Sequence, residues 1–110
     1  MTNGATEGSP DFVSVTLERH QAWMLEEANG ACADFSKMQL SGKDFSNVQL
    51  SQAVMTGGDF SDTVFSSANL EKADLFSANL TNVDFRNANL TKAILRGANL
   101  KNANLNHAIL

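Results

Sequence analysis

Large apolar side chains recur at every fifth position from Phe35 to the end of the chain. The series reads Phe35, Leu40, Phe45, Leu50, Met55, Phe60, Phe65, Leu70, Leu75, Leu80, Phe85, Leu90, Leu95, Leu100, Leu105 and Leu110. Because 43% of all residues are apolar, sixteen independent positions would all be apolar by chance only about once in a million. The five-residue period is therefore a real property of the sequence.

A second series, made mostly of small side chains, lies two positions before the large ones. Its members are Ala33, Met38, Lys43, Val48, Ala53, Gly58, Thr63, Ala68, Ala73, Ala78, Val83, Ala88, Ala93, Ala98, Ala103 and Ala108. Ten of these sixteen residues are alanine, and Lys43 is the plainly polar member. The repeating unit is therefore small, polar, large, polar, polar. At Lys43 either the backbone bulges or the ammonium reaches outward to water.

A five-residue period fits neither a long α-helix nor a long β-strand. In a helix, five residues rotate by about 140°, so the large side chains would spiral around the axis. In a strand, an odd step reverses the face at every repeat. The pattern instead predicts short extended segments joined by bends, with the small and large residues pointing inward together. Coils of this kind stack about 4.8 Å apart and pair their backbones.

The repeat resembles that of the pentapeptide-repeat proteins, which is usually written A-(D/N)-L-x-x. The resemblance spans residues 33–110, about seven-tenths of the chain, and is clearest in Ala68-Asn69-Leu70. It implies an all-β solenoid, a right-handed quadrilateral β-helix with four repeats per coil and about four coils. Phe45, Phe65 and Phe85 then stack in one column.

The segment before the repeats is predicted to comprise a disordered tail, residues 1–10, and a capping segment with a helix, residues 11–32. A stacked solenoid exposes apolar groups and unpaired backbone at its ends, so it needs a cap. We expect an extended piece at Phe12–Val15, then a helix from about Thr16 to Ala28, ended by Asn29-Gly30.

The stretch LERHQAWM, residues 17–24, also resembles the helical lead-in with spaced His and Trp of some pentapeptide-repeat proteins. His20 is a candidate for proton transfer, but no second group is evident that would orient it. We therefore expect His20 to be a packed or capping residue. Trp23 is expected to plug the first coil.

The remaining polar residues predict no enzyme, no cofactor and no metal site. The sequence contains no Gly-rich phosphate loop, no zinc-ligand spacing and no context for a strained nucleophile. Five aspartates stand between the small and large residues of their repeats. These are Asp34, Asp44, Asp59, Asp74 and Asp84. At bends, such side chains bond to local backbone, which is the interpretation we favour over paired catalytic carboxylates.

Charge and cysteine content limit the possible partners and setting. The net charge of −4 lies in residues 1–32, because the seven acidic and seven basic side chains of residues 33–110 cancel. Residues 86–110 carry four bases and no acid, but they lack the interleaved aromatic residues that stack on bases, so nucleic-acid binding is not expected. With a lone Cys32, no apolar run of about 18 residues and no signal-like start, we expect a cytoplasmic protein without membrane contact. The resemblance implies a bacterial source.

These observations favour a non-enzymatic structural or protein-interaction module over two alternatives. Some pentapeptide-repeat proteins implicated in quinolone resistance resemble DNA and bind DNA gyrase, so the resemblance also admits a DNA-mimicking regulator. That role needs a strongly negative rod, whereas the repeat region here has no net charge. The second alternative is an oligomerisation subunit or a fragment of a longer repeat protein.

Apolar residues at outward positions are the candidates for partner binding. Val54, Val64, Ile94 and Ile109 stand where polar residues are expected, and Phe76 directly follows an inward residue. With twenty residues per coil, Val54, Phe76 and Ile94 are predicted to share one surface patch for an unknown protein partner.

The final repeats suggest a second interface. Leu100, Leu105 and Leu110 belong to a last coil that nothing in the sequence covers, so two copies are predicted to pair through it as a homodimer. The alternative is that the chain is part of a longer array.

Overall fold

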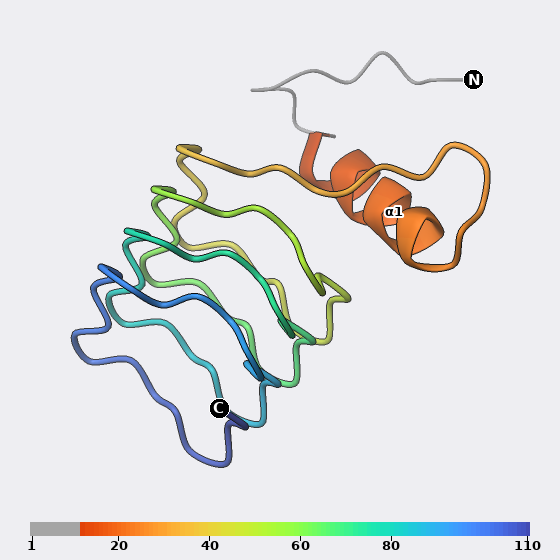
Figure 1. Cartoon of the computed structure of the whole chain (residues 1–110). Helices are drawn as coiled ribbons and strands as arrows, with labels where there is room; N and C mark the ends of the chain where they lie inside the picture. Colours follow the sequence, from red (N-terminus) through yellow and green to blue (C-terminus); the bar gives the residue numbers. More distant parts are fainter. Residues whose placement is uncertain (1–11) are drawn as a thin grey trace.

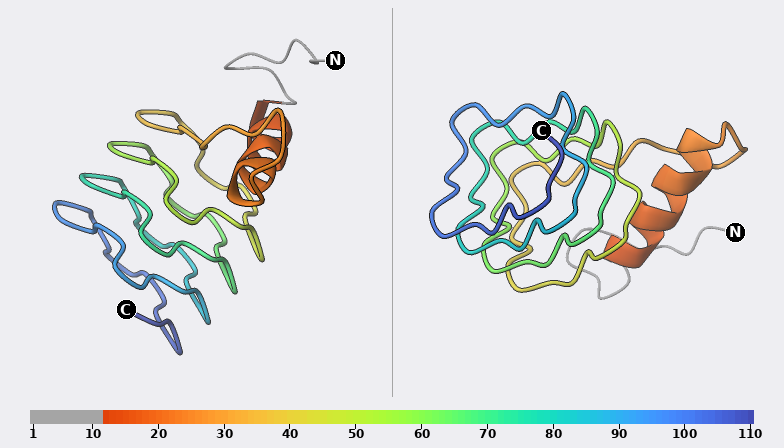
Figure 2. Two further views of the ribbon diagram at one scale, coloured as in Figure 1. Left: turned by 45° about the vertical axis from the view of Figure 1, so that its right-hand side comes forward. Right: turned by 90° about the horizontal axis from the view of Figure 1, so that it is seen from below.

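The computed structural model describes residues 12–110, which form one α-helix followed by a solenoid (Figure 1). Helix α1 runs over Phe12–Met24. From about residue 31 the backbone winds in coils that stack in parallel, with α1 lying at the end where the winding starts (Figure 2). The predicted tail, residues 1–10, lies outside the described residues. We refer to residues 31–50, 51–70, 71–90 and 91–110 as the first to fourth coils.

Parallel β-bridges between residues twenty positions apart define the stacking. They arrange the outward residues in four columns. The columns are Asp34, Val54, Asp74 and Ile94; Gln39, Asp59, Asn79 and Asn99; Asp44, Val64, Asp84 and Asn104; and Gln49, Asn69, Asn89 and Ile109. Each bridge is an isolated pair, because every extended segment is interrupted by a turn before a longer strand can form. One coil therefore takes twenty residues, or four repeats.

The two polar residues after each large one form a tight turn. In the turn that follows Leu70, the amide of Ala73 donates to the Leu70 carbonyl at 3.0 Å, and Lys72 has a φ of 61°. A positive φ at the third of four turn residues is the signature of a type II turn. The same conformation recurs every five residues, at Gly42 and Asn82 among others, which explains why Gly, Asn and small polar residues are frequent there.

Outward Asp and Asn side chains fasten the start of these turns. Their Oδ1 atoms accept a hydrogen bond from the backbone amide two residues further on. The acceptors are Asp34, Asp44, Asp59, Asn69, Asp74, Asn79, Asp84, Asn89, Asn99 and Asn104. The five aspartates singled out in the sequence thus bond to local backbone, as the sequence interpretation holds.

The core is the column of inward side chains along the solenoid axis. The twelve large residues from Phe35 to Leu90 are at most 3% exposed. The rings of Phe45 and Phe65 stack with centroids 5.0 Å apart, and those of Phe65 and Phe85 with centroids 5.6 Å apart. The inward register assigned from the five-residue period therefore matches the burial of these twelve residues.

Lys43 is exposed, although it occupies an inward register position. Its carbonyl still accepts the amide of Val64 at 3.0 Å, and the neighbouring Asp44 keeps its bridge to Val64. The backbone therefore stays in register, and the ammonium reaches outward, which resolves the two alternatives left by the sequence. A lysine fits there because the first coil has another coil on one side only.

Two details of the capping segment differ from the sequence expectation. Phe12–Val15, expected to be extended, forms the first turn of α1, where the Thr16 hydroxyl donates to the Phe12 carbonyl at 2.8 Å. A helical start lets Phe12, Val13 and Leu17 pack against the core, with the Phe12 ring 6.4 Å from that of Phe35. Tertiary packing thus outweighs the β preference of the valines.

The helix also ends earlier than expected, at Met24 rather than Ala28. The amide of Glu26 donates to the Trp23 carbonyl at 3.1 Å and that of Glu27 to the Ala22 carbonyl at 2.9 Å, with Glu26 at a φ of 58°. This pair of bonds is a Schellman motif, so Glu26 takes the left-handed position predicted for Asn29-Gly30.

Gly30 serves a different purpose. A Cβ atom there would lie 2.5 Å from the backbone of Trp23, so only glycine lets the returning chain pass so close to the helix.

Candidate functional site

His20 is the fully buried polar residue at the junction of α1 and the solenoid. Its Nε2 lies 2.8 Å from the Ser51 carbonyl oxygen, and the Ala33 amide donates to its Nδ1 at 2.9 Å. Because Nδ1 accepts a bond, the ring proton resides on Nε2, which donates to Ser51. Burial lowers the pKa of His20 from the usual 6.5, and the bond to Ser51 opposes this only in part.

The imidazole fills a gap in the backbone ladder. Elsewhere a carbonyl in the position of Ser51 accepts the amide nineteen residues earlier, as Glu71 accepts that of Gln52 at 2.8 Å. For Ser51 this partner would be the amide of Cys32, but His20 takes the carbonyl instead. His20 therefore acts as a side-chain substitute for a missing turn of the ladder, in agreement with the expected packing or capping role.

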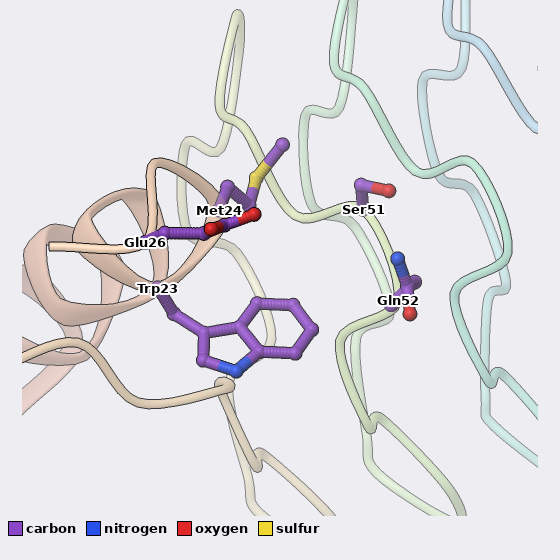
Figure 3. Close-up of a pocket in the computed structure, with 5 residues that line it drawn as sticks. All are labelled: Trp23, Met24, Glu26, Ser51 and Gln52. Atoms are coloured by element: carbon purple, nitrogen blue, oxygen red, sulfur yellow. The ribbon is translucent and has the colours of Figure 1, made fainter.

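A cavity of about 380 Å³ lies between the end of α1 and the start of the second coil (Figure 3). It is lined by Trp23, Met24 and Glu26 from the helix end and by Ser51 and Gln52 from the coil. Figure 3 shows the indole of Trp23 and the side chain of Glu26 directed toward the coil. Apart from Trp23, the sequence gives no signal for these residues, because they meet only once the helix is docked.

Trp23 does not plug the first coil as predicted. Its ring packs on His20, with centroids 5.2 Å apart, and it remains partly exposed at the cavity. Phe12, Val13 and Leu17 contact the core instead. The reason is the helix phase: once Phe12 starts the helix, these residues face the coil interior, whereas the indole of Trp23 lies against His20 and the cavity.

The predicted lateral patch, which comprises Val54, Phe76 and Ile94, is partly exposed. Phe76 is 42% and Ile94 46% exposed, whereas Val54 is half-buried. Val54 and Ile94 lie in one column on either side of Asp74, whose Oδ1 accepts the Phe76 amide at 3.1 Å. The structure therefore brings the three residues to one side of the solenoid, on the second, third and fourth coils.

The other outward apolar residues lie apart from this patch. Val64 is half-buried in the column of Asp44 and Asp84, and Ile109 is 57% exposed in the column of Asn69 and Asn89.

The fourth coil is less buried than the others. Leu95, Leu100 and Leu105 are half-buried, and Leu110 is 72% exposed. Leu95, Leu100 and Leu105 pack against the core, but no coil lies on their other side in the described structure. The candidate dimerisation residues thus form an apolar end surface.

An ion pair between Arg86 and Asp84 lies on the surface of the solenoid. The guanidinium of Arg86 makes two bonds to the carboxylate of Asp84, at 2.9 and 2.8 Å. The Arg86 side chain thereby lowers the pKa of Asp84. Lys92, Arg96 and Lys101 are exposed on the fourth coil, two of them flanking Ile94.

The described residues offer little for chemistry. Within residues 12–110 no three His, Cys, Asp or Glu side chains come together in a way that could hold a metal ion. Both ring nitrogens of His20 are occupied by backbone groups. Burial, with a smaller effect of Asp34, raises the pKa of the Cys32 thiol and makes it a poor nucleophile. Within the same range no helix is long and apolar enough to cross a membrane.

Comparisons with known proteins agree with this architecture. The family model for a pentapeptide repeat region matches residues 31–108. Rfr23, a pentapeptide repeat protein from the cyanobacterium Cyanothece 51142, is 35% identical with a TM-score of 0.61, and the alignment covers 70% of this chain and 56% of that one. Proteins of this kind form right-handed quadrilateral β-helices, consistent with the four columns of bridges.

Two further structures are similar. A pentapeptide repeat protein of the Arabidopsis thaliana thylakoid lumen is 34% identical with a TM-score of 0.45, covering 66% of this chain and 47% of that one. One from Nostoc PCC 7120 is 27% identical with a TM-score of 0.45, covering 83% and 73%. The chain spans about half the length of the first two of these three structures. No match was found among curated proteins.

Proposed function

This chain belongs to the pentapeptide-repeat family, and from that premise we propose that it is a non-enzymatic interaction module that binds a protein partner through the lateral patch of Val54, Phe76 and Ile94. The observation that carries the proposal is the exposure of two large side chains, Phe76 at 42% and Ile94 at 46%, on neighbouring coils. Water disfavours such apolar surface unless a partner covers it.

The scaffold supports this role because it holds the patch rigidly. The backbones of Phe76 and Ile94 are part of the hydrogen-bond ladder. The amide of Gly57 donates to the Phe76 carbonyl and the amide of Leu75 to the Ile94 carbonyl, each at 2.8 Å. A preformed surface loses little conformational freedom on binding. In this proposal the scaffold is a right-handed β-helix of about four coils, and α1 is its N-terminal cap.

The chemistry around the patch favours a protein over a nucleic acid. Lys92 and Arg96 flank Ile94, but the patch offers Phe76 as its single aromatic platform. The repeat region carries no net charge, which argues against DNA mimicry. We place the protein in the bacterial cytoplasm and away from membranes, on the strength of its lone Cys32 and its family resemblance.

A homodimer through the fourth coil is a second proposal for the chain as given. It is supported by the half-buried Leu100 and Leu105 and by Leu110, which is 72% exposed. Pairing would bury these residues between two copies. Sedimentation should show a dimer for the wild type and a monomer for Leu105→Lys; a monomeric wild type at about 100 μM would contradict this proposal.

The partner-binding proposal is tested by comparative capture from cells of the source organism. The bait proteins are the wild type, the Phe76→Ser/Ile94→Ser variant and Ile109→Ser, a control that removes an exposed apolar residue from a different column. The same proteins should be enriched by the wild type and the control and lost by at least about tenfold with the double variant, since apolar anchors dominate interfaces. Equal enrichment by all three baits, with equal thermal stability, would refute the assignment of the patch.

A further inference from the structure

The cavity at the end of α1 is the strongest candidate for a small-ligand site in the described chain. Its volume of about 380 Å³ falls in the range of small-molecule sites. It shares no residue with the lateral patch, so its occupancy does not depend on the proposed function.

The walls of this cavity are held in place before any ligand arrives. The indole of Trp23 packs on His20, which is itself pinned by two backbone groups. Behind the indole, the close passage of Gly30 leaves no space for the Trp23 backbone to retreat. The Schellman bonds fix the backbone of Glu26 at a φ of 58°, while its side chain is exposed. A ligand therefore meets a preorganised aromatic wall beside an exposed carboxylate.

Four of the five residues that line the cavity present electron-rich groups to it, and the fifth, Gln52, carries an amide with both a donor and an acceptor. Trp23 presents an aromatic ring, Met24 a thioether and Glu26 a carboxylate. The Ser51 hydroxyl donates its proton to the Glu71 carbonyl at 3.2 Å, so Ser51 offers lone pairs to the cavity. Neither Arg19 nor Lys72, the cations nearest along the chain and along the ladder, lines the cavity. An aromatic face beside a carboxylate is complementary to a cation with an apolar body.

We infer that this cavity binds an organic cation, with the ammonium or guanidinium group over the Trp23 ring and paired with Glu26. Two sources share this chemistry: a free quaternary ammonium compound, and a lysine or arginine side chain of another protein. Neutral molecules of equal shape lack both interactions and should be rejected.

Trp23 is the single tryptophan of the chain, so the tryptophan fluorescence reports on the surroundings of this one residue. The wild type is titrated with choline and, in parallel, with 3,3-dimethylbutan-1-ol, a neutral molecule of nearly the same shape, at constant ionic strength. Choline should change the emission saturably with a dissociation constant on the order of 10 mM, as expected when the cation–π contact is desolvated against the partly buried indole and one carboxylate adds to it. The alcohol should give no saturable change.

Matched carboxylate variants separate the site from general electrostatics. Glu26→Gln should weaken choline binding by about threefold to fivefold, because it removes the paired charge and keeps the side-chain shape. Glu27→Gln removes a neighbouring exposed carboxylate that does not line the cavity, so its binding curve should match that of the wild type. Circular dichroism melts of both variants verify that the fold is intact.

N-acetyl-lysine methylamide and N-acetyl-arginine methylamide identify the source. Tighter binding of choline supports a free ammonium compound, and tighter binding of either derivative supports a side chain of a partner. The inference is overturned if choline and the alcohol titrate alike, if Glu26→Gln and Glu27→Gln weaken binding equally, or if nothing saturates by about 100 mM. None of these results bears on the capture experiment, which tests a different surface.

Discussion

Replacing His20 tests how α1 is fastened to the solenoid. The side chain is 0% exposed and satisfies two backbone groups, the Ser51 carbonyl at 2.8 Å and the Ala33 amide at 2.9 Å. His20→Ala leaves both without a partner, at about 1 to 3 kcal/mol each, and opens a cavity beside Trp23. We therefore expect the free energy of unfolding to fall by about 3 to 5 kcal/mol in urea melts.

The pH dependence of the same contact has a defined sign. Burial holds the pKa of His20 below the value of 6.5 that it has when unfolded. Below pH 6.5 His20 binds a proton more readily in the unfolded chain than in the folded one. The stabilisation from His20 is therefore complete above pH 6.5 and is lost as the pH falls below it. One such group gives a slope of at most about 1.4 kcal/mol per pH unit.

His20→Gln separates titration from hydrogen bonding. Glutamine can replace both functions of neutral imidazole, with its NH2 group as donor and its carbonyl oxygen as acceptor, but it does not titrate. This variant should be more stable than His20→Ala at pH 7 and should lose less stability than the wild type between pH 7 and 5. His107→Gln, which makes the same substitution at an exposed histidine of the fourth coil, is the matched control.

Trp23 fluorescence and far-ultraviolet circular dichroism, followed in parallel, show which part unfolds. The Trp23 ring lies 5.2 Å from that of His20, so its emission reports release of α1, whereas circular dichroism also reports the solenoid. If wild type and His20→Gln show the same change between pH 7 and 5, or if His20→Ala costs less than about 1 kcal/mol, the assigned role of the imidazole is wrong.

Three further predictions concern the solenoid and its junction with α1. Phe65→Ala should destabilise by about 3 to 5 kcal/mol in denaturant melts, because the ring is 0% exposed between Phe45 and Phe85, whereas Ser66→Ala should be nearly neutral; the reverse order would contradict the inward register. Gly30→Ala should lower the melting temperature more than Gly42→Ala, because a Cβ at residue 30 meets the Trp23 backbone at 2.5 Å, whereas at residue 42 it meets nothing within 4 Å and costs only the strain of a φ of 76°; equal effects would exclude a tight packing at Gly30. The pKa of Asp34 is lowered mainly by its hydrogen bonds with the side chain and amide of Ser36, so the stabilisation it provides is present above pH 3.8 and lost below it. Asp34→Asn keeps an oxygen that can accept these bonds but does not titrate, so the free energy of unfolding should depend less on pH below 3.8. An unchanged pH dependence in acid would contradict this role of Asp34.

The solenoid was predictable because its constraint repeats. One five-residue rule places every inward side chain, and an error at a single site, such as Lys43, does not shift its neighbours, since the ladder continues through the Lys43 carbonyl. The capping segment has no such redundancy. Its helix start at Phe12 depends on contact with Phe35, more than twenty residues later, so local preferences alone misplace it.

The candidate sites differ in the same way. Phe76 and Ile94 were visible as apolar residues that violate a periodic pattern, and the twenty residues per coil implied by the family resemblance supply their spatial relation. The cavity could not be predicted from the sequence pattern. Its residues Glu26 and Ser51 become neighbours only through the Schellman turn and through the docking of α1 by His20. A signal did exist in part: a histidine beside a tryptophan, followed by a glycine, in a segment that must cover a ladder end with unpaired backbone groups.

The junction of α1 with the solenoid differs from the interior coils in how its backbone groups are satisfied. Within the ladder, the hydrogen bonds are made by backbone amides, which every residue except proline provides. The interior coils therefore tolerate changes in their outward side chains. At the start of the ladder the Ser51 carbonyl has no such amide and relies on one side chain, so the fit of α1 depends on the identity of residue 20. Since the same imidazole supports the Trp23 wall, a change at His20 should weaken cation binding at the cavity as well as stability, whereas Phe65→Ala should affect stability alone. Choline titrations of His20→Gln and Phe65→Ala, carried out where both are fully folded, distinguish this coupling from a general loss of structure.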